Sequence, residues 1–267
     1  MFWVEFIGAS GVGKSYLYKK LKETRTSADD WLTPDEGLKI IINKENLLRQ
    51  HRLHKRLYYA IKKLLIRKNN DFEIIPTSYI KKAFDTHGWK FNFLSEIKIR
   101  NYAETSYLEP RKRLSDISWY YHKRLLPFIV LYAANINKTF LFEDGILHTN
   151  LGISNLDEYL NTIDSNEQVI YPNAIVHAKA NPEVIFERVK KRNKTKQGTI
   201  AQRDLSDIQI REDIRNRMEK DVSTVKNLSK KVSRILEIDT TDSLVKNCKY
   251  INSFINDLNS SKVSELD

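Results

Sequence analysis

A glycine-rich run close to the N-terminus carries the clearest chemical signal in the sequence. The pattern G-x-x-x-x-G-K-[ST] is matched by Gly8, Ala9, Ser10, Gly11, Val12, Gly13, Lys14 and Ser15. Glycines let the backbone N–H groups of such a loop turn toward phosphate oxygens, and the start of a following helix adds a positive dipole. Lys14 would reach the β- and γ-phosphates, while the Ser15 hydroxyl would ligate Mg²⁺. The run therefore predicts a binding site for ATP and Mg²⁺, and a plain turn at a helix start is the alternative.

Two neighbouring acids follow an apolar run in the middle of the chain. Residues 139–142 predict a short buried strand, and Glu143 and Asp144 come directly after it. A carboxylate at the end of a strand beside a phosphate loop can hold Mg²⁺ or its water shell, and a second one can orient or deprotonate the attacking hydroxyl. We assign Glu143 to the metal and Asp144 to the base. Side chains alternate along an extended chain, so the reverse assignment stays open, as does a pair of solvated acids.

Arginines in the second half of the chain supply the third part of the predicted chemistry. Arg188 and Arg192 lie four residues apart, on one face of a predicted helix. Guanidinium groups can hold the charge that spreads over a transferred phosphoryl group. Arg203 and Arg211, in and after the polar segment that follows, are further candidates. The alternative for all four is a basic helix end and a solvated loop.

The elements that must position these residues alternate between strand and helix. Strands are predicted at residues 2–7, 139–142, 173–178 and 235–239, and helices at 14–23, 182–192, 204–230 and 243–258. This alternation indicates an α/β fold with a parallel sheet. We expect one domain over residues 1–267, with a large helical insertion at about 38–135 and a lid region at about 188–215.

The composition narrows the class of protein. The chain has 267 residues, 41% hydrophobic and 30% charged, which indicates a folded globular protein, and no apolar run reaches the roughly 18 residues of a membrane-spanning helix. A net charge of +11 favours an anionic partner, such as a nucleotide, a phosphorylated metabolite, nucleic acid or a membrane surface. One cysteine, Cys248, excludes an intrachain disulfide, and the first residues lack the pattern of a signal peptide. We therefore expect a cytoplasmic protein, whose oligomeric state the sequence leaves open.

Two stretches carry a resemblance to a known family. Residues 173–192 contain a strand, the turn Asn181-Pro182-Glu183 and the helix with Arg188 and Arg192. This run resembles the strand, turn and arginine-bearing lid helix of the P-loop kinases, a group that includes thymidylate kinase and the deoxynucleoside kinases. Residues 235–240 and the terminal helix resemble the last strand and helix of the same group. The resemblance implies a three-layer P-loop NTPase fold and an ATP-dependent kinase, in which Lys14 and both arginines act on the phosphates.

The sequence departs from these families after the predicted strand 139–142. Thymidylate kinases carry Asp-Arg there and deoxynucleoside kinases carry Glu-Arg-Ser, whereas this chain has Glu143-Asp144-Gly145. The arginine helps to hold substrate in those families, so we expect a different acceptor, a small hydroxyl compound such as a sugar or saccharide intermediate. The alternatives are a nucleoside or nucleoside monophosphate kinase and, from another class, an NTP-dependent ATPase or switch that binds nucleic acid.

Two other segments are weaker candidates. Residues 44–68 contain nine Lys or Arg residues, which could form a face for an anionic acceptor, nucleic acid or a membrane surface, although a solvated amphipathic helix explains them as well. Asp35 and Glu36 follow a possible second strand, and either could serve as the general base for the acceptor. Pro34 and Gly37 make a plain turn equally acceptable there.

Overall fold

The structure is a computed structural model, and it describes residues 1–27, 29–44, 75, 77–91, 110–145, 171–195 and 205–264. Five strands form one sheet in the order β2-β3-β1-β4-β5. The strands are β1 (Phe2–Ile7), β2 (Trp31–Leu32), β3 (Thr139–Phe142), β4 (Ala174–Lys179) and β5 (Arg234–Asp239). The pairings β2–β3, β1–β4 and β4–β5 are all parallel, with Val4 opposite Ala174 and Ala174 opposite Arg234.

The central strands form where the sequence is mostly apolar, with Glu5 in β1 and His177 in β4 as buried polar exceptions. Residues 3–7 of β1 and 174–178 of β4 are fully buried, as expected for central strands of a parallel sheet with helices on both faces. The edge strand β5 alternates instead, with Ile238 buried between the exposed Glu237 and Asp239. The predicted α/β class with a parallel sheet is confirmed.

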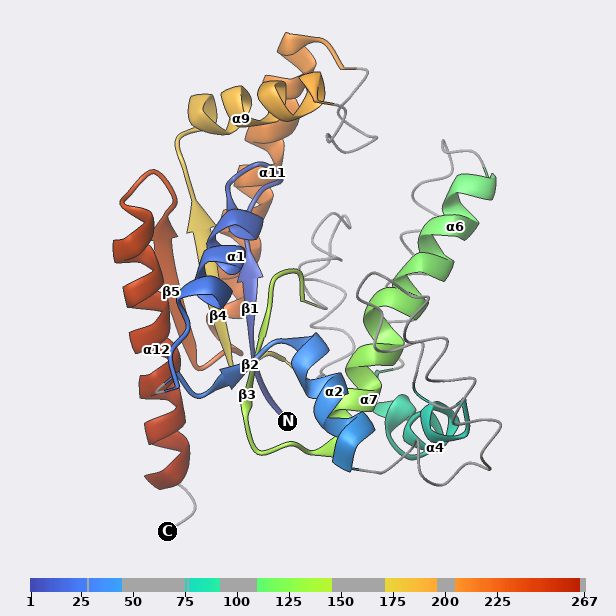
Figure 1. Ribbon diagram of the computed structural model, residues 1–267. Helices are drawn as coiled ribbons and strands as arrows, with labels where there is room; N and C mark the ends of the chain where they lie inside the picture. The colour runs from blue at the N-terminus through green and yellow to red at the C-terminus, as the bar shows by residue number, and fades with distance from the viewer. Residues whose placement is uncertain are drawn as a thin grey trace. The chain divides into compact units, whose positions relative to one another are not determined.

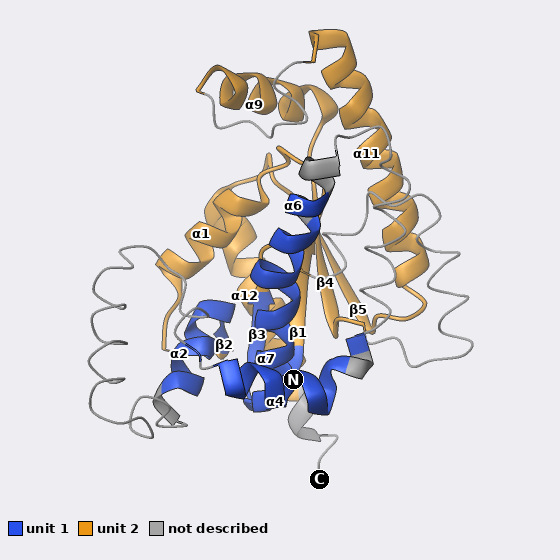
Figure 2. Cartoon of the chain, turned by 90° about the vertical axis from the view of Figure 1, so that its right-hand side faces the viewer, with its two compact units in different colours: residues 1–2, 31–141, 160–170 blue, residues 3–30, 142–159, 171–267 orange. Residues whose placement is uncertain are grey.

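The chain divides into two compact units, coloured separately in Figure 2. Unit 1 comprises Met1–Phe2, Trp31–Leu141 and Leu160–Ile170, and unit 2 comprises Trp3–Asp30, Phe142–Tyr159 and Tyr171–Asp267. The predicted single domain over residues 1–267 stays a prediction.

Among its described residues, unit 2 holds the glycine-rich loop and four helices, which are α1 (Lys14–Thr24), α9 (Pro182–Lys194), α11 (Asp207–Leu228) and α12 (Leu244–Ser264). Helices α1 and α12 pack together on one face of its strands, and α11 lies on the other (Figures 1 and 2). Helix α9 begins as the sequence predicts, because the Asn181 side chain accepts a hydrogen bond from the Glu183 N–H and Pro182 needs no partner there. A capping box between Ser206 and Gln209 starts α11.

The described part of unit 1 is mainly helical. Its described helices are α2 (Pro34–Lys44), α4 (Thr77–His87), α6 (Pro110–Tyr120) and α7 (Leu126–Ala134), with a 3₁₀ turn at Gly88–Phe91 and a π-helical turn at Tyr121–Leu125. Helix α7 is apolar and buried over residues 128–131, and both α2 and α4 pack against it. The Phe91 ring meets Phe128 and Tyr132 edge-on, with centroids 5.4 and 5.2 Å apart. The π-helical turn comes just before Pro127, where the sequence predicts a kink or break.

Some expectations differ from the structure or fall outside it. The helix expected from residue 38 begins at Pro34, because Thr33 and Glu36 cap it: the Thr33 N–H donates to Glu36 Oε2 over 2.8 Å. The sequence also predicts a helix at residues 155–161, and this range lies outside the described residues, as do residues 45–74, 92–109 and 196–204. None of the described helices combines the length and apolar character that a bilayer-spanning segment requires.

Candidate active site

The loop between β1 and α1 has the backbone shape of a phosphate cradle. Gly8, Gly11 and Gly13 all adopt positive φ, at 151°, 90° and 115°. The side chains of Ala9 and Val12 point away from the loop into a core made with β4, α9 and α11. The loop is thus anchored by its apolar side chains and by the hydrogen bond that the Val12 N–H donates to the Ala9 carbonyl oxygen over 3.1 Å.

Gly11 cannot be replaced by a larger residue without a loss of stability. A Cβ atom at Gly11 would lie 2.7 Å from Val189 Cγ2 and 3.3 Å from Ile185 Cγ2, both on α9. Its φ of 90° is also one that L-residues rarely adopt. Helix α9 therefore packs directly against the loop, and the sequence signal for a phosphate site coincides with a packing requirement.

Lys14 is buried, with 8% of its surface exposed, and its side chain folds back over the loop. Its Nζ donates hydrogen bonds to the carbonyl oxygens of Gly8, over 2.5 Å, and Ala9, over 3.5 Å. Burial lowers the pKa of Lys14, and the negative charges of Asp144, Asp221 and Glu143 act in the opposite direction. The ammonium thus stands in a poorly solvated place that an anionic ligand would favour.

Glu143 and Asp144 lie where β3 ends, half-buried and within electrostatic reach of Lys14. The negative charges of both acids oppose the effect of burial on the pKa of Lys14, and Asp144 contributes more than Glu143 does. Their turn requires Gly145, because a Cβ atom there would lie 1.8 Å from Cδ of the fully buried Glu5 on β1. Glu5 in turn accepts a hydrogen bond from Trp3 Nε1 over 3.0 Å. The sequence offered no sign of this buried acid beneath the acidic pair.

Arg188 contacts the loop from α9. Its Nη1 donates to the Val12 carbonyl oxygen over 2.5 Å and to Thr240 Oγ1 over 2.9 Å, and its Nη2 donates to the Thr240 carbonyl oxygen over 3.1 Å. Thr240, the residue after β5, also donates its hydroxyl to the Val12 carbonyl. In this conformation the guanidinium fastens the loop to the end of β5, a role that the sequence did not suggest.

Arg192, one turn further along α9, reaches the outer tip of the loop. Its Nη2 donates to Ser10 Oγ over 3.3 Å. Burial lowers the pKa of Arg192, and the nearby charge of Arg217 on α11 adds to this. A long contact to a loop hydroxyl is easily exchanged for a phosphate oxygen, so Arg192 is better placed than Arg188 to meet a ligand.

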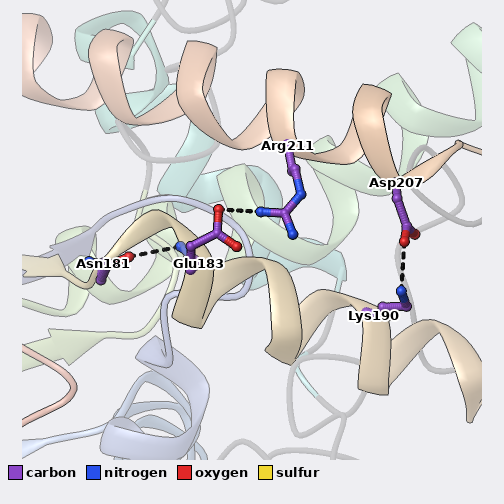
Figure 3. A network of polar contacts seen from close by, with 5 residues as sticks. All are labelled: Asn181, Glu183, Lys190, Asp207 and Arg211. Atoms are coloured by element: carbon purple, nitrogen blue, oxygen red, sulfur yellow. Dashed lines mark hydrogen bonds and ion pairs between the residues drawn. The ribbon is translucent and has the colours of Figure 1, made fainter.

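Arg211, a weaker candidate, is instead part of a network that joins α9 to α11 (Figure 3). Its guanidinium pairs with Glu183 and stacks on the Phe186 ring, 3.7 Å from the centroid. Lys190 and Asp207 form a second pair between the same helices, 2.6 Å apart. Arg211 thus cross-links the two helices, and Arg203 lies outside the described residues.

Asp221 is a residue of this site that the sequence interpretation missed. It lies on α11, with 7% of its surface exposed, and the positive charges of Lys14 and Arg217 act on it. Burial, the largest effect, raises its pKa to about 6. A signal was present: the buried stripe of α11 is otherwise formed by Ile210, Ile214, Thr224, Val225 and Leu228. A charged residue in such a stripe is rare unless it is paired or functional.

The candidate base in unit 1 has another role. The Glu36 carboxylate caps α2 through the Thr33 N–H and the Thr33 hydroxyl, 2.8 and 3.0 Å away. Asp35 lies exposed in the first turn of the same helix. The basic segment 44–68 lies outside the described residues except for Lys44, the last residue of α2.

The donor set suits Mg²⁺ held together with phosphates. Within the described ranges, no three His, Cys, Asp or Glu side chains form a metal site by themselves. Mg²⁺ in phosphoryl-transfer sites usually needs only one or two protein ligands besides phosphate and water. Ser15, exposed in the first turn of α1, and one acid after β3 meet that need.

Comparison with known proteins finds similarity only among solved structures. No family model matches the chain, and no curated protein matches it. A structure of deoxyadenosine kinase from M. mycoides with the products dCMP and dCDP is 13% identical, has a TM-score of 0.40 and covers 97% of this chain and 100% of its own. Another structure of that enzyme, with bound dATP, is 11% identical, has a TM-score of 0.41 and covers 96% of this chain and 100% of its own. Both similarities extend over nearly the whole length of the two chains that are compared.

Proposed function

We propose that the chain is an ATP-dependent phosphotransferase whose active site is the Gly8–Ser15 loop and the charged groups around it. One observation supports this most. The charges of acids on two separate segments, after β3 and on α11, and the charge of Arg192 on α9 all affect the pKa of the same buried lysine, Lys14. A lysine, acids that can organise a metal and an arginine around one glycine-rich bend are the parts that phosphoryl transfer requires. All of these residues belong to unit 2.

ATP would bind with its phosphates on the backbone N–H groups of the loop. Lys14 would leave the Gly8 carbonyl and donate to the β- and γ-phosphates. Ser15 and one acid after β3 would hold Mg²⁺, which neutralises charge on the phosphates when it is bound. Arg192 would exchange Ser10 for the transferred phosphoryl group, and Arg188 would keep the loop in shape.

The two acids after β3 divide the remaining work. The charges of both acids act on Lys14, so either carboxylate could face the phosphates. We keep the assignment made from the sequence, in which Glu143 holds Mg²⁺ and its water shell and Asp144 orients or deprotonates the acceptor hydroxyl, with the reverse assignment as the alternative. Both roles need a carboxylate, so Glu143→Gln and Asp144→Asn distinguish them by their different dependence on Mg²⁺ concentration.

The acceptor we propose is an uncharged nucleoside. No contact among the described residues identifies a saccharide, and the two similar structures are those of a deoxyadenosine kinase, so the nucleoside alternative is the better supported. The chain carries Asp144 where the related families carry an arginine. An acid at this place repels a second phosphate group, which favours a nucleoside over a nucleoside monophosphate.

A transfer screen with γ-labelled ATP over nucleosides, nucleoside monophosphates and sugars tests the proposal. We expect transfer to a nucleoside that Lys14→Ala reduces by at least about a hundredfold. Lys19→Ala is the matched control, because Lys19 lies on the same helix with its side chain 77% exposed. Hydrolysis that is stimulated by DNA or RNA, without transfer to any acceptor, would instead support the nucleic-acid ATPase.

A further inference from the structure

Asp221 is the charged side chain of this site that the proposed function leaves unused. It projects from α11 into the buried interior of unit 2, with only 7% of its surface exposed. Among the residues that the structure describes, none hydrogen-bonds to its Oδ2 atom. A buried carboxylate oxygen without a hydrogen bond is costly, and a structural role would be served better by an apolar residue.

The charges around Asp221 explain how the carboxylate is tolerated without a ligand. Lys14 on α1 and Arg217, one turn earlier on α11, both favour its ionised form. The positive charge of Lys14 is not available to Asp221 alone, however. Asp144 and Glu143 interact with the same ammonium, and the positive charge of Arg192 on α9 has the opposite effect on its pKa. Arg217 is shared as well, since it donates to both oxygens of Asp213 over 2.9 Å.

We propose that Asp221 takes up a proton from solvent when the phosphates of a nucleotide bind at the Gly8–Ser15 loop. This rests on the proposed function. A polyphosphate draws the Lys14 ammonium to itself and adds negative charge nearby, so the buried carboxylate loses its counter-charge and meets a like charge. The carboxylate then becomes a neutral carboxylic acid, whose O–H no longer repels the phosphates. Nucleotide binding is in this way coupled to pH.

The size of the uptake follows from the state of the free protein. With a pKa of about 6, Asp221 is about nine-tenths ionised at pH 7, so the uptake can reach about 0.9 proton per nucleotide. Binding that takes up a proton is favoured at low pH. The Kd for ATP should therefore rise as the pH increases from 6 to 8, by up to tenfold per pH unit.

Isothermal titration calorimetry with ATP and excess Mg²⁺, in buffers of different ionisation enthalpy at pH 7, measures the protons taken up. We expect the wild type to take up more protons than Asp221→Asn does, and Glu219→Gln, which removes an exposed acid of the same helix, to behave as the wild type. Asp221→Leu, which fits the apolar stripe, is the second variant without the charge. Both Asp221 variants should bind ATP more tightly than the wild type at pH 8.

Two results separate this inference from the proposed function. If ATP binds the wild type but its proton uptake equals that of both Asp221 variants, the inference is wrong and the proposed function stands. Weaker ATP binding by both variants at pH 8 would also overturn the inference, because it would make the carboxylate a favourable contact. If the wild type does not bind ATP, the proposed function itself fails.

Discussion

Replacing the buried Asp221 by asparagine should stabilise the folded protein at neutral pH. Asparagine has the shape of the neutral acid and lacks the charge whose burial is unfavourable. In the folded protein the pKa of Asp221 is raised from 3.8 to about 6, mainly by burial. A rise of this size corresponds to about 3 kcal/mol of folding free energy that is lost once the group is ionised.

The sign follows from proton binding. Between pH 3.8 and about 6 the folded protein binds a proton at Asp221 that the unfolded chain has released, so stability from this group is present below pH 3.8 and is lost as the pH rises through 6. Other carboxyl groups have the opposite effect on the pH dependence of stability. The pKa of Glu237 is lowered by a hydrogen bond from Lys179, and that of Asp239 by one from Thr241. The informative quantity is therefore the difference between the variant and the wild type.

Thermal and urea unfolding at several pH values between 4 and 8 measure that difference. Near pH 4 the two proteins should be about equally stable, and by pH 8 Asp221→Asn should be the more stable by up to about 3 kcal/mol, which is roughly 6 °C or more in Tm for a chain of this size. Glu219→Gln, on the exposed side of α11, should show no such pH-dependent gap. A gap that stays constant with pH, or a variant that is less stable at pH 8, would refute the reasoning, because Asp221 would then be a favourable buried contact.

Two further predictions concern the loop and the acidic turn. Gly145→Ala should cost about 3 kcal/mol of stability, because its Cβ atom would overlap the buried Glu5 carboxyl, and much less in a Glu5→Ala background, as a double-mutant cycle by urea unfolding would show. Arg188→Ala should lower stability by about 2 kcal/mol through its lost hydrogen bonds to Val12 and Thr240, whereas Arg192→Ala should keep stability and lower kcat on the order of a hundredfold. Equal effects of both arginines on stability and kcat would contradict this division.

The elements that carry the chemistry could be predicted because their signals are local. The glycine-rich run has a strand before it and a helix after it, and β3, β4 and β5 are apolar runs bounded by polar residues. The start of α9 was predictable for the same reason, since Asn181 and Pro182 form a helix start within three residues.

The role of each charged residue depends on tertiary contacts, and the sequence could not supply these. Arg188 and Arg192 look alike in sequence, but their partners, Thr240 and Ser10, lie 52 and 182 residues away. In the sequence, Glu36 is a candidate general base for the acceptor. The Thr33-x-x-Glu36 spacing is itself a capping signature, however, and in the structure Glu36 caps α2. Asp221 could not be singled out from the sequence, because α11 contains many charged residues and Asp221 is only one of them.

The acids after β3 and the acid on α11 share one electrostatic partner. Glu143, Asp144 and Asp221 all act on one lysine, while Arg188 is engaged by the loop and Thr240. In the proposed function, these acids are the negative charges that oppose the effect of burial on the Lys14 ammonium before a nucleotide binds. When the phosphates arrive, the same acids oppose them unless each is neutralised. The acids after β3 can be neutralised by Mg²⁺, and a carboxylate on α11 that has no hydrogen bond at Oδ2 can be neutralised by a proton.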